Sequence, residues 1–159
     1  MSFYKNQDLD FVIRTKKLIK QYDSFQIDKN DKFEVTLLIN CCVGLLILPQ
    51  QRLFNNLPEE LIDKKNWGIS PQEISVMINR HKKTEKKNIK NIARHLRNSV
   101  AHYRFAALPK KIEDITEINF KDYLNDKSTL SFEVTVKIDD LKIFANKISN
   151  HFITIMKNS

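Results

Sequence analysis

The chain has 159 residues, of which 42% are apolar and 29% charged, so its length and composition predict one globular domain spanning 1–159. Its only glycines, Gly44 and Gly68, are too few for a glycine-rich phosphate loop, which excludes P-loop and dinucleotide-binding enzymes. The formal net charge of +8 favours a polyanionic partner, although a lysine-rich, A·T-biased genome can produce the same charge without one.

The cysteines and the apolar segments predict where the protein resides. Cys41 and Cys42 are adjacent and have no spacing suited to zinc, so we expect two buried thiols, no metal and no cofactor. Residues 1–10 are too polar for a signal peptide, and the apolar run 35–48 is too short to span a bilayer. We therefore expect a cytoplasmic protein without a membrane partner.

The first half of the chain reads as helical. Residues 8–22 have apolar positions at helical spacing, and residues 31–48 form a second, almost entirely apolar helix that begins at Asp31 and stops at Pro49. The sequence Ser70-Pro71-Gln72-Glu73 is typical of a helix start, so residues 70–78 are expected to form a short helix. A long helix is expected from about residue 85 to 105, ended by Pro109.

The second half adds strands. Ile115, Ile118 and Phe120 indicate a modest first strand, and residues 130–138 alternate between apolar and polar side chains as a half-buried strand does. The polar turn 125–127 joins the two as a hairpin, and Asp139 or Asp140 caps a last amphipathic helix. The predicted fold class is mainly α, a helical bundle with one β-hairpin inserted before the C-terminal helix.

The long helix carries the chemistry. At 100° per residue, its core stripe runs through Leu96 and includes Tyr103, while His102 projects from the opposite face with Asn98 beside it and Arg97 at the flank. An imidazole exchanges protons near neutral pH, and a guanidinium neutralises a developing phosphorane-like charge. This pairing suits phosphodiester cleavage by the 2′-hydroxyl of RNA, a reaction that needs no metal.

The same helix face predicts a homodimer. Asn98, Ala101 and Phe105 lie on it, and an exposed phenylalanine beside a small residue is typical of a covered surface. Packing two such helices together would place two Arg97 and His102 pairs in one cleft. The alternative is that Phe105, near the helix end, folds back under the loop at Pro109.

The segment Arg97-Asn98-Ser99-Val100-Ala101-His102 resembles the arginine–polar–three residues–histidine motif of the HEPN superfamily. Together with the apolar helix ending Leu-Leu-Ile-Leu-Pro49-Gln50, the hairpin and the final helix, it makes residues 11–155 similar to a small bacterial HEPN subgroup. The resemblance implies a helical bundle and a metal-independent ribonuclease site at a dimer interface. Arg97 and His102 would be catalytic, with Asn98 positioning or polarising them.

The resemblance also bears on biological role. Such domains act as growth-arresting toxins or phage-defence effectors, which implies an antitoxin protein as a further partner. Toxins silenced by a nucleotidyltransferase carry a tyrosine two residues after the histidine, where this chain has Arg104, while Tyr103 is expected to face the core. Regulation at that position is therefore not expected. Other HEPN domains have lost activity, so the alternative is a non-catalytic nucleic-acid-binding or protein-interaction module.

A basic stretch precedes the motif. It predicts either an RNA-binding track or a solvated face, and its members are Arg80, Lys82, Lys83, Lys86, Lys87, Lys90 and Arg94. Of the other histidines, His81 is read as solvated, His95 as a packing residue between core and surface, and His151 as a surface residue. Trp67 is expected to plug a core edge, with base stacking as its alternative.

Overall fold

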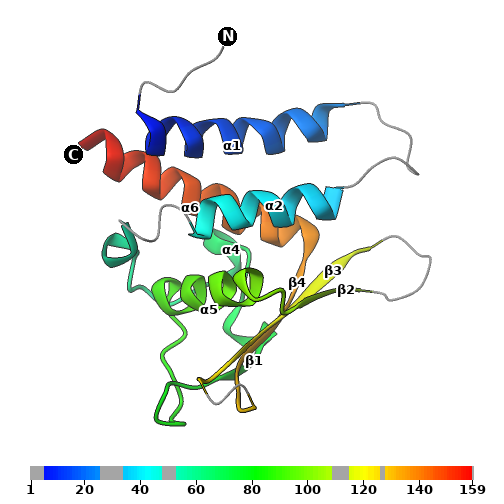
Figure 1. Cartoon of the computed structure of the whole chain (residues 1–159), viewed down its shortest axis with the longest axis vertical. Coiled ribbons are helices and arrows are strands. Elements are labelled where there is room, and N and C mark those ends of the chain that lie inside the picture. The colour runs from blue at the N-terminus through cyan, green and yellow to red at the C-terminus, as the bar shows by residue number, and fades with distance from the viewer. Residues whose placement is uncertain (1–5, 26–33, 48–52, 109–114, 126–127, 159) are drawn as a thin grey trace.

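A computed structural model describes residues 6–25, 34–47, 53–108, 115–125 and 128–158. Figure 1 shows a layer of helices and, beneath it, a further helix that lies against a twisted sheet. In chain order the elements are α1 (Gln7–Ser24), α2 (Glu34–Ile47), η2 (Phe54–Asn56), α4 (Lys64–Trp67), η3 (Pro71–Glu73), β1 (Ile74–Met77), α5 (Ile89–Ala101), β2 (Phe105–Leu108), β3 (Glu117–Tyr123), β4 (Leu130–Lys137) and α6 (Ile138–Asn158).

The helical layer forms as the apolar spacing predicts. Asn6 caps α1 by accepting a 3.2 Å hydrogen bond from the Leu9 amide, and Val12 of the same helix is fully buried. The predicted stripe of α6 is confirmed, because its buried residues include Phe144, Ile148 and Phe152. α2 contacts α1, α5 and α6, so this apolar helix is central to the core, as expected. Its predicted start at Asp31 and stop at Pro49 lie outside the described residues.

The predicted single hairpin is wrong: the structure has a four-stranded antiparallel sheet in the order β1-β4-β3-β2. The hairpin strands β3 and β4 form as expected and pair from Glu117 with Lys137 to Tyr123 with Leu130. A strand is then added on each side: β1 comes from a segment that we expected to be helical, and β2 begins at Phe105, the last residue of the expected long helix. Residues 126–127 of the predicted turn lie outside the described residues.

β1 replaces the short helix expected over residues 70–78. The helix-start signal is real, because Ser70 and Glu73 form a reciprocal capping box, but only one 3-10 turn follows. The chain then extends so that Ile74 pairs with Val134 and Met77 with Phe132. Pairing with the exposed backbone edge of β4 therefore prevails over the local helical preference.

The long helix is shorter at both ends than residues 85–105. Asn88 caps α5 at its N-terminus, so the helix begins at Ile89, and it ends at Ala101 with His102 as its C-cap. Tyr103 then takes a left-handed backbone conformation, with φ of 54°. β2 follows and pairs with β3, which brings Phe105 opposite Phe120. Pro109, the expected end of the helix, lies outside the described residues.

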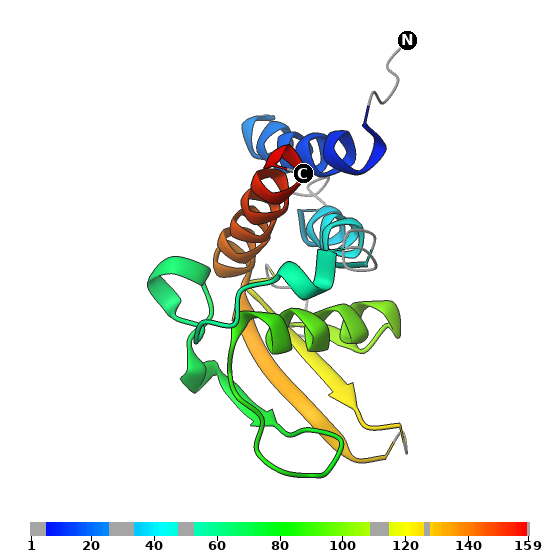
Figure 2. The same cartoon turned by 90° about the vertical axis from the view of Figure 1, so that its left-hand side faces the viewer.

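Figure 2 shows α5 lying across one face of the sheet. Ile118, Phe120 and Asp122 are the buried positions of β3, and they alternate with half-buried residues, so these three side chains form the face beneath α5. α5 is thus enclosed between α2 and the sheet. This placement brings the polar end of β3 against the residues that the sequence marks as catalytic.

Two smaller predictions concern the core. Trp67 is 7% exposed, donates a 2.9 Å hydrogen bond from Nε1 to Glu60 and lies against Phe144, which confirms that it plugs a core edge. Cys41 and Cys42 are buried and unbridged, and burial raises the pKa of their thiols to about 11 and about 12. None of the helices in the described ranges has the length and apolarity that crossing a bilayer requires.

Candidate functional site

The predicted catalytic residues gather at the C-terminal end of α5. Arg97 and Asn98 belong to its last two turns, and His102 follows directly after the helix. The His102 amide donates a 3.0 Å hydrogen bond to the Asn98 carbonyl, which ties the two residues together through the backbone. The His102 side chain is exposed, whereas Arg97 and Asn98 are half-buried. The imidazole is therefore accessible to solvent and to a substrate.

Asn98 holds Arg97. Its Oδ1 accepts from Arg97 Nε at 3.2 Å and from Nη2 at 2.9 Å, while its Nδ2 donates to Asp122 Oδ2 at 2.9 Å. Because a carboxylate only accepts and a guanidinium only donates, these partners fix which end of the amide faces which group. Asn98 therefore links the Arg97 guanidinium to a buried carboxylate and fixes the orientation of the guanidinium.

That anion is Asp122 of β3, whose side chain is 4% exposed. Its Oδ2 also accepts from His95 Nδ1 at 2.9 Å, and its Oδ1 accepts from Arg104 Nη1 at 3.2 Å and from the Tyr123 amide at 2.9 Å. Burial alone would raise the pKa of this carboxyl, but hydrogen bonds from His95 and Asn98 outweigh it and lower the pKa. Asp122 is therefore ionised at neutral pH.

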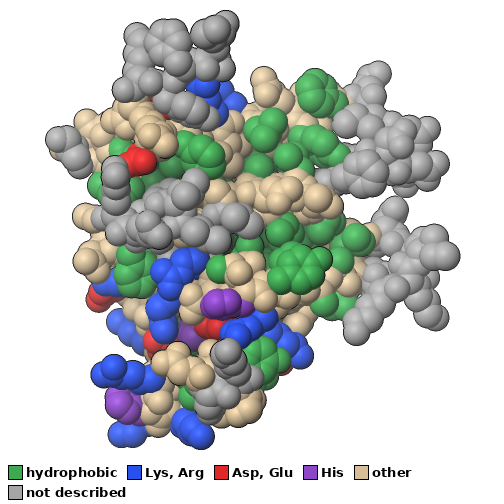
Figure 3. Space-filling model, in the orientation of Figure 1, with side chains coloured by type: hydrophobic (Ala, Val, Ile, Leu, Met, Phe, Trp, Pro, Cys, Tyr) green, Lys and Arg blue, Asp and Glu red, His purple; other side chains and the backbone are tan. Residues whose placement is uncertain are grey.

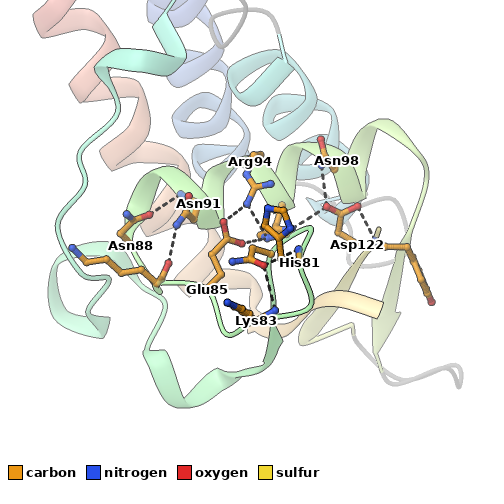
Figure 4. A network of polar contacts seen from close by, with 12 residues as sticks. His81, Lys83, Glu85, Asn88, Asn91, Arg94, Asn98 and Asp122 are labelled. Carbon is orange, nitrogen blue, oxygen red and sulfur yellow. Dashed lines mark hydrogen bonds and ion pairs between the residues drawn. The ribbon is translucent and has the colours of Figure 1, made fainter. Parts of the chain in front are cut away.

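His95 is the buried centre of the same network, and it is 2% exposed. Its ring stacks on Phe132 with centroids 4.8 Å apart and an interplanar angle of 2°. Its Nε2 lies 2.9 Å from Glu85 Oε2, and Glu85 in turn pairs with Arg94. The expected packing role is thus present, but the ring also bridges two carboxylates. Figure 4 shows this polar seam running from Glu85 to Asp122 beneath α5.

Glu85 and Asp122 are the site residues that the sequence reading missed. A signal existed for Asp122, because it occupies an inward position in the alternation that begins with Ile118 and Phe120. A charged residue at a core-facing strand position needs buried partners, and His95 and Asn98 supply them. No comparable signal marked Glu85, which stands between Thr84 and Lys86 in the basic stretch.

The basic stretch divides into residues that face the site and residues that do not. Arg80, Lys82 and Arg94 line a hollow of about 310 Å³ together with His95, Asn98 and Asp122. By contrast, Lys87 Nζ donates to the carbonyls of Pro71 and Ile74, and Lys90 pairs with Glu59. Lys83 and Lys86 are exposed and do not line the hollow. Of the residues predicted to bind RNA, Arg80, Lys82 and Arg94 therefore line this hollow, and the other four do not.

Figure 3 places these cations in the context of the surface. In this view Lys, Arg and His side chains gather over the lower part of the molecule, and apolar side chains are more frequent over the upper, helical part. His81 is exposed within the basic region, as predicted, and its Nε2 accepts a hydrogen bond from Arg80 Nε at 3.1 Å. His151 is half-buried, and its Nε2 lies 2.7 Å from the carbonyl oxygen of Asn56.

The face proposed for dimerisation is arranged differently from the prediction. Ala101 is exposed at the end of α5, but Phe105 lies on β2, half-buried, with its ring centroid 6.3 Å from that of Phe120. Tyr103 was predicted to face the core, and this prediction is wrong. Because α5 stops at Ala101, Tyr103 lies outside the helix and is 81% exposed. The predicted common helix face of Asn98, Ala101 and Phe105 therefore does not exist as a continuous stripe.

Among the residues that the structure describes, no group of three or more His, Cys, Asp or Glu side chains is placed to hold a metal ion. A family model described as HEPN pEK499 p136 matches residues 1–159. No curated protein and no solved structure gave a match.

Proposed function

Because the chain belongs to the HEPN pEK499 p136 family, we propose that it is a metal-independent endoribonuclease that cleaves RNA by attack of a 2′-hydroxyl. One observation carries the proposal: Arg97 is oriented by Asn98 at the same helix end that presents an exposed His102. An oriented cation and an accessible proton carrier are the two groups that this reaction requires.

The reaction assigns a task to each side chain. His102 accepts the proton of the 2′-hydroxyl as the oxygen bonds to the adjacent phosphorus, and Arg97 neutralises the charge that grows on the phosphate oxygens. The bond from phosphorus to the 5′-oxygen then breaks, and that oxygen takes up a proton. The products are a 2′,3′-cyclic phosphate and a 5′-hydroxyl. Asn98 is a positioning residue, since it acts by holding Arg97.

A homodimer is part of this proposal, because a second His102 would supply the proton that the leaving oxygen requires. Ala101 is the last residue of α5 and is exposed, so a partner helix could approach it closely. In the cytoplasm such an enzyme would act as a growth-arresting toxin or a phage-defence effector restrained by an antitoxin protein. This biological role rests on the family alone.

The RNA backbone is proposed to approach through the hollow lined by Arg80, Lys82 and Arg94. Its cations would neutralise phosphates and release counterions, so binding would weaken as salt rises. The hollow also reaches Asn98, which connects this path to the residue that orients Arg97.

The test is cleavage of total RNA in excess EDTA by the wild-type chain and by His102→Ala. We expect the wild type to leave 2′,3′-cyclic phosphate ends and His102→Ala to leave RNA intact. His151→Ala is the matched control, because this histidine is partly accessible but bonds to Asn56, and it should cleave normally. Equal cleavage by His102→Ala and the wild type would reject the assignment of the site.

A second candidate is a non-catalytic RNA-binding module, and the basic hollow favours it independently of His102. In that case neither protein would cut RNA, both would bind it equally, and Arg80→Ala with Lys82→Ala would weaken binding. A protein-interaction module is the remaining alternative; it would bind its partner through the surface around Ala101 and show neither RNA binding nor cleavage.

A further inference from the structure

Tyr103 is an aromatic side chain that the proposed reaction does not use. It follows His102 directly and is 81% exposed, the most of any large apolar side chain in the described part of the chain. Its φ of 54° is a left-handed conformation that non-glycine residues adopt at an energetic cost. An exposed aromatic ring in a strained backbone beside a reactive residue needs an explanation beyond folding.

The turn that carries Tyr103 is fixed by backbone hydrogen bonds. The Tyr103 amide donates to the Val100 carbonyl at 3.1 Å, and the next amide, that of Arg104, donates to the Ser99 carbonyl at 2.7 Å. The Tyr103 ring meets the edge of Phe105 in a T-shaped contact, with centroids 4.9 Å apart. The ring is therefore held in place by its neighbours yet remains mostly open to solvent.

A hollow of about 420 Å³ adjoins the ring, and its lining mixes aromatic and basic side chains. Arg104 lies over the Tyr123 ring, 5.1 Å from its centroid, and forms part of the wall. Lys121 also lines the hollow; its side chain is 42% exposed and pairs with Glu133 at 3.2 Å. Rings that accept bases, beside cations that follow the backbone, are the features by which proteins bind single-stranded nucleic acid.

We propose that Tyr103 is a base-stacking subsite for single-stranded RNA, which holds the nucleotide next to the phosphate at which the 2′-hydroxyl attacks. The inference rests on the proposed ribonuclease function and adds where an unpaired base is held. The base would stack on the Tyr103 ring, and the adjoining phosphate would lie toward Lys121. A second copy of the chain is a poorer occupant, because charged residues such as Lys121 and Glu133 are depleted at the centres of protein interfaces.

The experiment measures RNA binding separately from cleavage. In the His102→Ala background, fluorescence anisotropy would follow binding of an eight-nucleotide oligouridine and of an oligomer of equal length with abasic positions. We expect Tyr103→Ala to weaken oligouridine binding by about tenfold and Tyr103→Phe to retain it, because stacking needs the ring and not the hydroxyl. Binding of the abasic oligomer should not change. Phe25→Ala is the matched control, since Phe25 is a 59% exposed aromatic residue at the end of α1.

Several results would overturn the subsite. They are equal binding by Tyr103→Ala and its parent, an equal loss on the abasic oligomer, or a loss that coincides with dissociation of an oligomer in sedimentation velocity, which would make Tyr103 a subunit contact. Cleavage by chains that retain His102 separates the two proposals. If the wild type cuts RNA but Tyr103→Ala binds normally, only the subsite fails. If the wild type does not cut but the base-dependent loss occurs, only the ribonuclease proposal fails.

Discussion

Two histidines seven residues apart, His95 and His102, have opposite surroundings. His95 lies within α5 at 2% exposure, between Glu85 and Asp122 and stacked on Phe132. His102 lies just beyond the helix end and is exposed. The first has its polar atoms paired inside the protein, which suits structural support, and the second is open to a substrate, which suits proton transfer.

The contrast shows that one histidine is placed for structural support and the other for contact with a substrate. A general base must exchange its proton with substrate and solvent, and a ring enclosed by two carboxylates and a phenylalanine cannot readily do so. What the buried histidine can do is hold Asp122, which holds Asn98, which in turn orients Arg97. The two regions are therefore linked, and each prediction below separates support from reactivity.

The largest difference is expected in stability. His95→Ala should lower the free energy of unfolding by about 3 kcal/mol, because it removes a buried ring and takes one hydrogen-bond partner from each of two carboxylates. His102→Ala should change it by less than about 0.5 kcal/mol, since the side chain is exposed. Urea unfolding followed by circular dichroism measures both. Equal losses would show that the two histidines do not differ as described.

Asp122→Asn is expected to have an intermediate effect, about 2 kcal/mol of stability. Both carboxylate oxygens accept from donors, so the amide group of an asparagine must face a donor on one side. Asn98 then loses its fixed orientation, and RNA cleavage should fall about tenfold in kcat with little change in KM. Asp140→Asn is the control. Asp140 also pairs with a cation, that of Lys64, but it is remote from Asn98, so its replacement should leave kcat unchanged.

Acid should reveal the same anion, with a smaller effect than the substitution has. Because the pKa of Asp122 is lower in the folded protein than in the unfolded chain, its contribution is complete above the usual aspartate range, near pH ~3.9. The contribution is lost as pH falls from there through the lowered pKa. The free energy of unfolding, measured between about pH 5 and pH 2, should therefore fall less steeply with acid in Asp122→Asn than in the wild type. Parallel curves would contradict the assignment.

The smallest effect is expected at Tyr103, next to His102. Glycine adopts a positive φ without steric cost, although it loses more backbone entropy on folding. Tyr103→Gly should therefore raise the free energy of unfolding by about 0.5 kcal/mol while losing RNA affinity. Thermal unfolding and anisotropy, measured on the same preparation, test the pair of effects. A less stable variant would indicate that the ring supports the fold.

Periodic patterns in the sequence predicted the elements that form their own amphipathic face. The alternation of residues 130–138 gave β4, and the stripe through Phe144 and Ile148 gave α6. β1 and β2 were missed because each is a four-residue strand that exists only by pairing with a neighbour. Such short segments have too little local pattern to oppose a helix-start signal or the predicted continuation of a helix.

The same limit applies to the site. Arg97, Asn98 and His102 could be named because they lie within six consecutive residues with a recognisable spacing. The exact end of α5 could not be placed, and that error of a few residues put Tyr103 in the core when it is exposed. Asp122 lies on strand β3, 24 residues after Asn98 on α5, so only the folded chain brings the two together.

The buried seam from Glu85 to Asp122 also has an evolutionary consequence. Each of its carboxylates, together with His95 and Asn98, is satisfied by another member, so a mutation in one leaves the others with an unmet charge or hydrogen bond. We therefore expect single replacements to be selected against and compensated pairs to be tolerated. Across descendants of a common ancestor, these positions should therefore be inherited as a block, even where the exposed lysines of the basic stretch drift independently.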